Sequence, residues 1–74
     1  MRRVGTAVRT AQGMLVLEAN DDPPAPGTEV VTAELTTVGS VVEYFGPVTE
    51  PYVLVDPTAD TEAASLLGQP LYAR

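Results

Sequence analysis

Hydrophobic and polar residues alternate near the amino end of the chain. Two sets of positions result: Val4, Thr6 and Val8 on one face, and Arg3, Gly5 and Arg9 on the other. This period of two is typical of a half-buried β-strand and predicts one over residues 4–10. The following Ala11-Gln12-Gly13 predicts a tight hairpin, because glycine takes a positive φ without strain. The hairpin leads into residues 14–19, a second predicted strand that is apolar on both faces.

Strand and loop signals continue to the carboxyl end. Residues 20–27 contain two aspartates, three prolines and a glycine, which predicts a rigid loop. The later regular segments are predicted strands at 28–34, 37–45, 52–55 and 71–72, and one or two helical turns at 61–67. Six short strands separated by glycine and proline indicate an all-β fold, a small six-stranded split barrel with one short helical turn near its carboxyl end.

The length of 74 residues fits a single domain, residues 1–74. A domain of this size buries only about 60% of the surface that its unfolded chain exposes, so its core is thin. Closing the sheet into a barrel would remove the exposed edges that a small open sheet must protect. Any apolar surface reserved for a partner lowers the stability of so small a fold on its own. We therefore expect the protein to work within a complex.

The charge is strongly one-sided: ten acidic residues and four arginines give a net charge of −6, and lysine and histidine are absent. An acidic, lysine-free surface suits a cytoplasm at molar salt, where the Debye length falls to roughly 3 Å. We interpret it as halophilic adaptation. It also disfavours direct binding to nucleic-acid phosphates, which depends on lysine and arginine displacing counterions.

No apolar run approaches the roughly 20 residues of a membrane helix, so we expect a cytoplasmic protein without membrane contact.

Side chains that could carry catalysis are scarce. Without histidine, cysteine or lysine, the chain lacks the usual general base, thiol nucleophile and Schiff-base amine. The adjacent Asp21 and Asp22 lie in the predicted loop, which offers no shielded site for a catalytic carboxyl pair. Asp56 and Asp60 have a spacing that could ligate a hard cation, but we favour an Asp-Pro turn and a helix cap, because the other ligands of a calcium loop are absent. We expect no enzyme activity, metal or cofactor.

The segment 46–51 begins with a glycine and has a proline near each end. One interpretation is a hairpin connection that proline merely rigidifies; the other is a preorganised binding loop. Tyr44, Phe45 and Tyr52 surround it, which favours binding, since rigid aromatic anchors lose few torsions when a partner binds. Strand alternation predicts that one of Tyr44 and Phe45 faces inward and the other outward.

Residues 38–53, VGSVVEYFGPVTEPYV, resemble the Gar/Naf family of H/ACA ribonucleoproteins, whose pattern is V-G-x-V, then F-G-P-V, then P-Y. The segments 26–30 and 67–72 are similar to the family's flanking motifs, so the resemblance covers almost the whole chain. The lysines common in the family are replaced by threonine, serine and glutamate, in line with halophily. Glycine–arginine flanking segments are absent from the sequence, which leads us to expect the archaeal, Gar-type subunit.

The resemblance implies a non-catalytic subunit that binds the catalytic domain of the pseudouridine synthase, a dyskerin-type homologue. It would promote RNA-guided rRNA pseudouridylation by biasing a substrate-gripping loop of the synthase, and would meet guide RNA only through the complex. Position-by-position matching assigns a main contact loop and two supporting residues in the strand before it. The contact loop is Phe45, Gly46, Pro47, Val48, Pro51 and Tyr52, and the supporting residues are Gly39 and Val41.

Two other functions stay open. The pattern V-G-x-V-x-E at residues 38–43 also resembles the opening of PRC-type barrels of ribosome maturation, although those lack the G-P-V and P-Y pairing. A direct single-stranded RNA-binding barrel could stack bases on the clustered aromatic rings. Such a barrel needs basic residues around the rings, whereas Glu43 and Glu50 flank them in this sequence.

Overall fold

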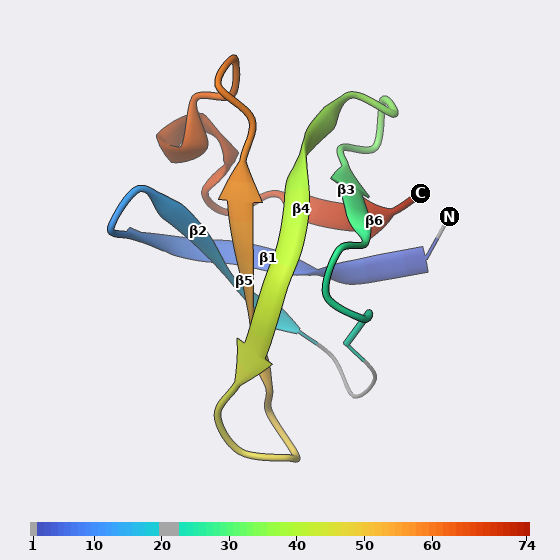
Figure 1. The fold of residues 1–74 in the computed structure, drawn as a ribbon, viewed down its shortest axis with the longest axis vertical. Helices are drawn as coiled ribbons and strands as arrows, with labels where there is room; N and C mark the ends of the chain where they lie inside the picture. The colour runs from blue at the N-terminus through green and yellow to red at the C-terminus, as the bar shows by residue number, and fades with distance from the viewer. Residues whose placement is uncertain (1, 20–22) are drawn as a thin grey trace.

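The computed structural model describes residues 2–19 and 23–74. These residues form six strands and one 3-10 turn (Figure 1): β1 (Arg2–Ala11), β2 (Met14–Ala19), β3 (Glu29–Val31), β4 (Thr37–Phe45), β5 (Tyr52–Pro57), η1 (Ala63–Leu66) and β6 (Pro70–Ala73). The prediction of a six-stranded all-β fold is confirmed, and β2 and β4 have the predicted bounds. The predicted loop at 20–27 lies partly outside the described residues.

The strands close into an antiparallel barrel in the order β1-β2-β5-β4-β3-β6. β6 completes the barrel because it pairs with β1 on one side and with β3 on the other. Each strand and η1 contribute apolar side chains to one core: Val4, Ala7, Leu15, Leu17, Ala19, Val30, Val38, Val41, Val53, Val55, Leu66, Leu71 and Ala73. Burial of each of the larger aliphatic side chains contributes about 1.5–3 kcal/mol, so this shared core is the main source of stability.

Two β-bulges in β1 overturn the predicted alternation. The pairing register of β1 shifts once opposite β6 and once opposite β2. An extra residue in one strand moves the side chains that follow it to the other face of the sheet. Val4 and Ala7 therefore enter the core, whereas Val8 is 41% exposed. The expectation that Val4, Thr6 and Val8 share one face was wrong.

The turns follow the local sequence. Gln12 and Gly13 have φ of 53° and 81°, the left-handed backbone of a two-residue hairpin turn, which confirms the predicted connection between β1 and β2. β3 is shorter than the predicted strand at 28–34 because a turn begins at Thr32. The amide of Thr32 donates to the carbonyl of Thr36, and its hydroxyl accepts from the amides of Glu34 and Thr36. These bonds turn the chain away from β6.

The segment around η1 packs against the barrel near β1. η1 is shorter than the predicted 61–67, and its Leu66 is buried in the core. Glu62 occupies the N-cap position without a side-chain hydrogen bond, so the helix cap predicted from the 56–60 segment was wrong. Gly68 follows with a φ of 85°, and its amide donates to the Ala7 carbonyl at 2.7 Å. The glycine thus turns the chain back along β1 into β6, which begins at residue 70.

Candidate functional site

The connection between β4 and β5 projects from the barrel. Within the barrel body β4 pairs with β3 up to Ser40 and with β5 along most of its length. Among the described residues, the pairing partners of Tyr44 and Phe45 all belong to β5. Figure 1 shows the connection, residues 46–51, at the end of the molecule opposite the helical turn. We call residues 44–52 the β4–β5 tip; they lie beyond the core.

Backbone geometry holds the tip in one shape. Gly46 has a φ of 94°, and a Cβ added to it would lie 3.1 Å from Cδ2 of Tyr52, so a side chain there meets both backbone strain and crowding. The amide of Glu50 donates to the Pro47 carbonyl at 3.1 Å. Pro51 is buried, and its carbonyl accepts from the Ala19 amide of β2 at 3.0 Å. The tip is therefore a tight turn anchored to the neighbouring strand.

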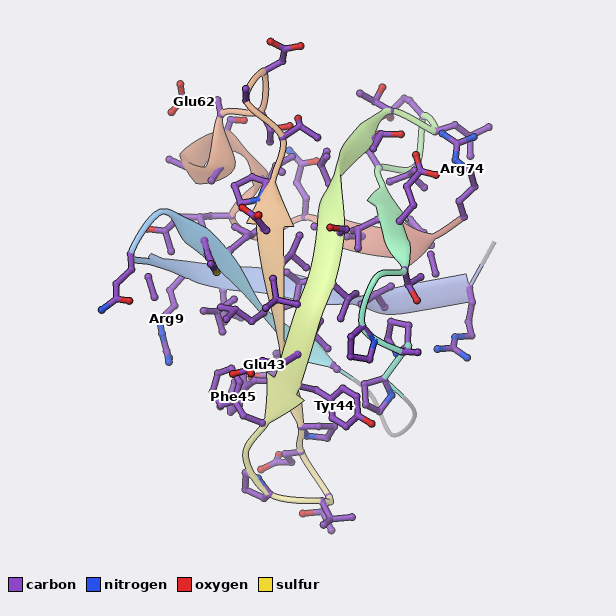
Figure 2. All side chains as sticks on the ribbon, in the orientation of Figure 1. Arg9, Glu43, Tyr44, Phe45, Glu62 and Arg74 are labelled. Carbon is purple, nitrogen blue, oxygen red and sulfur yellow. The ribbon has the colours of Figure 1, made fainter. Side chains whose placement is uncertain are left out.

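The aromatic side chains divide between the two faces of the tip. Phe45 and Tyr52 are register partners and their rings stack, with centroids 5.7 Å apart and planes at 25°. Figure 2 shows Phe45 and Glu43 on one side of β4 and Tyr44 on the other. Tyr44 is 51% exposed and Phe45 is 39% exposed. The prediction that one of them faces the core was wrong, because β4 has already passed the end of the core at this point.

A shallow apolar groove of about 250 Å³ runs along the tip. The residues that line it within the described part of the chain carry no charged side chain: Pro23, Tyr44, Phe45, Gly46, Pro47, Val48 and Pro51. Among these lining residues, Val48 is 92% exposed. Five of the six residues predicted for the contact loop therefore line the groove, and the sixth, Tyr52, stacks on Phe45.

Sequence reasoning missed two residues beside the tip. Pro23 comes from the connection between β2 and β3 and lines the groove. Arg9 comes from β1, and its guanidinium carbon lies 6.0 Å from the centroid of the Tyr52 ring. The proline-rich loop was visible in the sequence, but its position beside the tip depends on barrel closure. Arg9 had no sequence signal that related it to Tyr52.

The two predicted supporting residues lie in the barrel body. Val41 is 2% exposed and belongs to the core. Gly39 is buried against β5, where an added Cβ would clash with the Asp56 carbonyl oxygen and lie 2.9 Å from the Pro57 Cα. Neither residue is accessible to a partner, so any support that Gly39 and Val41 give to the tip passes through the packing of β4 on β5.

A second cavity, of about 550 Å³, lies near the carboxyl end and is lined by Arg2, Pro23, Pro24, Ala25, Thr28, Ala73 and Arg74. Arg74 forms an ion pair with Glu29 at 3.2 Å and also donates to Thr37. Asp21 and Asp22, considered above as a carboxyl pair, lie outside the described residues. Within residues 2–19 and 23–74, no three histidine, cysteine or acidic side chains gather closely enough to hold a metal ion.

No protein-family model matches the chain, and no curated protein is significantly similar to it. In the part of the chain that the structure describes, no helix is long and apolar enough to cross a membrane.

Proposed function

We propose that this protein is a non-catalytic docking subunit of the Gar type, which binds the catalytic domain of an H/ACA pseudouridine synthase through the β4–β5 tip. The observation that carries the proposal is the exposed and rigid apolar tip itself. Val48 is 92% exposed and lines a groove whose described residues are uncharged, and a glycine and two prolines set the turn that presents it. The sequence pattern of residues 38–53 supplies the identity of the partner.

The composition of the tip suits protein binding. Interface cores are depleted in charged residues and enriched in aromatic ones, and this groove combines two aromatic rings with prolines. A turn already held by the Glu50–Pro47 and Ala19–Pro51 hydrogen bonds loses little conformational freedom on binding. In so acidic a chain, a groove whose described lining residues are uncharged reduces repulsion from an acidic partner. These features favour a protein over a nucleic-acid backbone as the direct contact.

In this role the protein promotes RNA-guided rRNA pseudouridylation without touching the reacting uridine. A partner that binds one conformation of a synthase loop more tightly than another shifts the loop population by the difference in affinity. The subunit therefore needs a shaped docking surface and no catalytic group. Substrate turnover would rise only to the extent that the tip discriminates between the two loop conformations.

Calorimetric titration in molar KCl tests the proposal directly. We expect saturable 1:1 binding to the H/ACA pseudouridine synthase of the same organism and none to guide RNA alone. Val48→Asp should weaken synthase binding by at least about 30-fold, since an unpaired charge at a buried interface centre costs at least about 2 kcal/mol. Leu67→Asp is the matched control, because Leu67, like Val48, is an exposed aliphatic residue. It is 43% exposed and lies directly after η1, outside the β4–β5 tip. The control should change affinity by less than about two-fold.

A second variant separates docking from folding. Pro47→Ala combined with Tyr52→Ala should reduce synthase affinity while the far-UV circular dichroism spectrum stays that of the folded barrel. Absence of synthase binding by the wild-type protein, or equal loss in Val48→Asp and Leu67→Asp, would overturn the docking role. Loss of the folded spectrum in the double variant would assign Pro47 and Tyr52 to stability.

A direct single-stranded RNA-binding function is the second candidate, because the structure places a cation beside the ring stack. Arg9 lies over Tyr52, and Tyr52 stacks on Phe45. Aromatic stacking with an arginine nearby is the chemistry of single-strand binding. Binding of guide RNA without binding of the synthase in the same titrations would favour this function over docking.

A further inference from the structure

Arg9 lies outside the β4–β5 tip and far from it in sequence, yet the fold brings its guanidinium to the tip. Arg9 pairs with Val16 of β2, Val16 pairs with Leu54 of β5, and Tyr52 precedes Leu54 by two residues on the same face. The Arg9 side chain therefore crosses the outer face of β2 to reach the Tyr52 ring, 6.0 Å from its centroid. Figure 2 shows Arg9 on the same side of β4 as Phe45.

The surroundings of Arg9 indicate that packing, rather than an ion pair, directs this side chain. Val16 lies on the outer face of the barrel but is only 1% exposed, and the aliphatic part of Arg9 is placed to cover it. Glu18 is the register partner of Tyr52 and shares that face. Among the described residues, Arg9 nevertheless forms no ion pair within 4 Å. The contact that the guanidinium does make is with the Tyr52 ring.

Contacts continue from Arg9 to the turn without a break. Tyr52 stacks on Phe45 at 5.7 Å, and Tyr52 also lies against Gly46, where an added Cβ would come within 3.1 Å of the ring. Gly46 opens the turn that carries Val48. A displacement of the Tyr52 ring would therefore change both the stack and the start of the turn.

We propose that Arg9 is a positioning residue for the β4–β5 tip. Its guanidinium holds the Tyr52 ring from the outer face, the stacked rings set the angle of the tip, and the groove with Tyr44 and Val48 is left for the partner. Tyr52 then acts as an internal support and not as a contact residue. The step from tip orientation to partner affinity rests on the proposed function; the step from Arg9 to tip orientation does not.

The first arm of the test uses the free protein. In NMR spectra, Arg9→Leu should shift the ring signals of Tyr52 and Phe45 and increase backbone mobility over residues 46–50, whereas Arg9→Lys should restore part of the wild-type pattern. Arg3→Leu is the matched control, because Arg3 is an exposed arginine of the same strand that donates to Thr6 at 2.8 Å. It should leave the tip signals unchanged. Unchanged ring signals in Arg9→Leu would overturn the proposal.

The second arm is a double-mutant cycle on synthase affinity. Arg9→Leu should weaken binding by about two- to five-fold, the range for an exposed cation–π contact, and should have no further effect in the Tyr52→Leu background. Additive losses would overturn the positioning role and make Arg9 an independent contact residue. If the wild-type protein does not bind the synthase, the proposed function fails, and the NMR arm alone decides whether Arg9 positions the tip.

Discussion

Replacement of Gly39 by alanine tests whether Gly39 is needed for the packing of the barrel or for contact with the partner. The resemblance placed Gly39 at the edge of the docking site, but the structure packs its Cα directly on the backbone of β5. A Cβ at residue 39 would clash with the Asp56 carbonyl oxygen and would lie 2.9 Å from Cα of Pro57 and 3.0 Å from the carbonyl carbon of Asp56. All three are backbone atoms of β5, from Pro57, the register partner of Gly39, and from its neighbour Asp56, so no side-chain rotation relieves the overlap.

The cost follows from that crowding. Overpacking of a close-packed site costs typically about 1–3 kcal/mol and sometimes more, and relief at Gly39 requires β4 and β5 to separate. A domain of 74 residues has a total stability of about 4–11 kcal/mol. We expect Gly39→Ala to lose about 2–3 kcal/mol. At about 4–8 °C per kcal/mol for a domain of this size, the Tm should fall by roughly 10–20 °C.

Thermal unfolding followed by circular dichroism in molar KCl measures this loss, and calorimetric titration with the synthase below the lowered Tm measures binding by the remaining folded protein. Ser40→Ala is the matched control, because Ser40 is the exposed neighbour of Gly39 in β4, and its Tm should change by only a few degrees. An unchanged Tm for Gly39→Ala together with weaker binding would refute the packing argument and make Gly39 a contact residue.

Three further predictions concern the turns and the solvent. Gly46→Ala should cost about 1–2 kcal/mol, because alanine is strained at a φ of 94°, and should lower both Tm and synthase affinity; retention of both would show that the turn adapts. Thr32→Val should cost about 1–2 kcal/mol in urea denaturation, since it removes the hydroxyl that accepts from Glu34 and Thr36, while a stability equal to wild type would mean that water replaces those bonds. The folded circular dichroism spectrum should weaken in dilute buffer and recover in molar KCl, as screening relieves the repulsion within a chain of net charge −6; an identical spectrum in both would contradict halophilic adaptation.

Local sequence was sufficient for most of the secondary structure. β2 and β4 have the predicted bounds, and the Gln12-Gly13 hairpin is where a two-residue turn was expected. These features depend on neighbours in the chain: β-branched and apolar runs favour extended backbone, and glycine accepts positive φ. The length of β3 was overestimated because the hydroxyl of Thr32 bonds to nearby amides and starts a turn inside a β-branched run.

The sequence by itself thus determined six short strands, the Gln12-Gly13 turn and the composition of the β4–β5 tip. Only the tertiary structure decided which side chains of β1 enter the core, since bulges are set by pairing with β2 and β6 and reverse the alternation that a single strand displays. Closure also decided that Tyr44 and Phe45 are both exposed, and it brought Pro23 and Arg9 to the tip. The physical reason is that backbone preference acts between adjacent residues, whereas exposure and ring contacts depend on strands that meet only when the barrel closes.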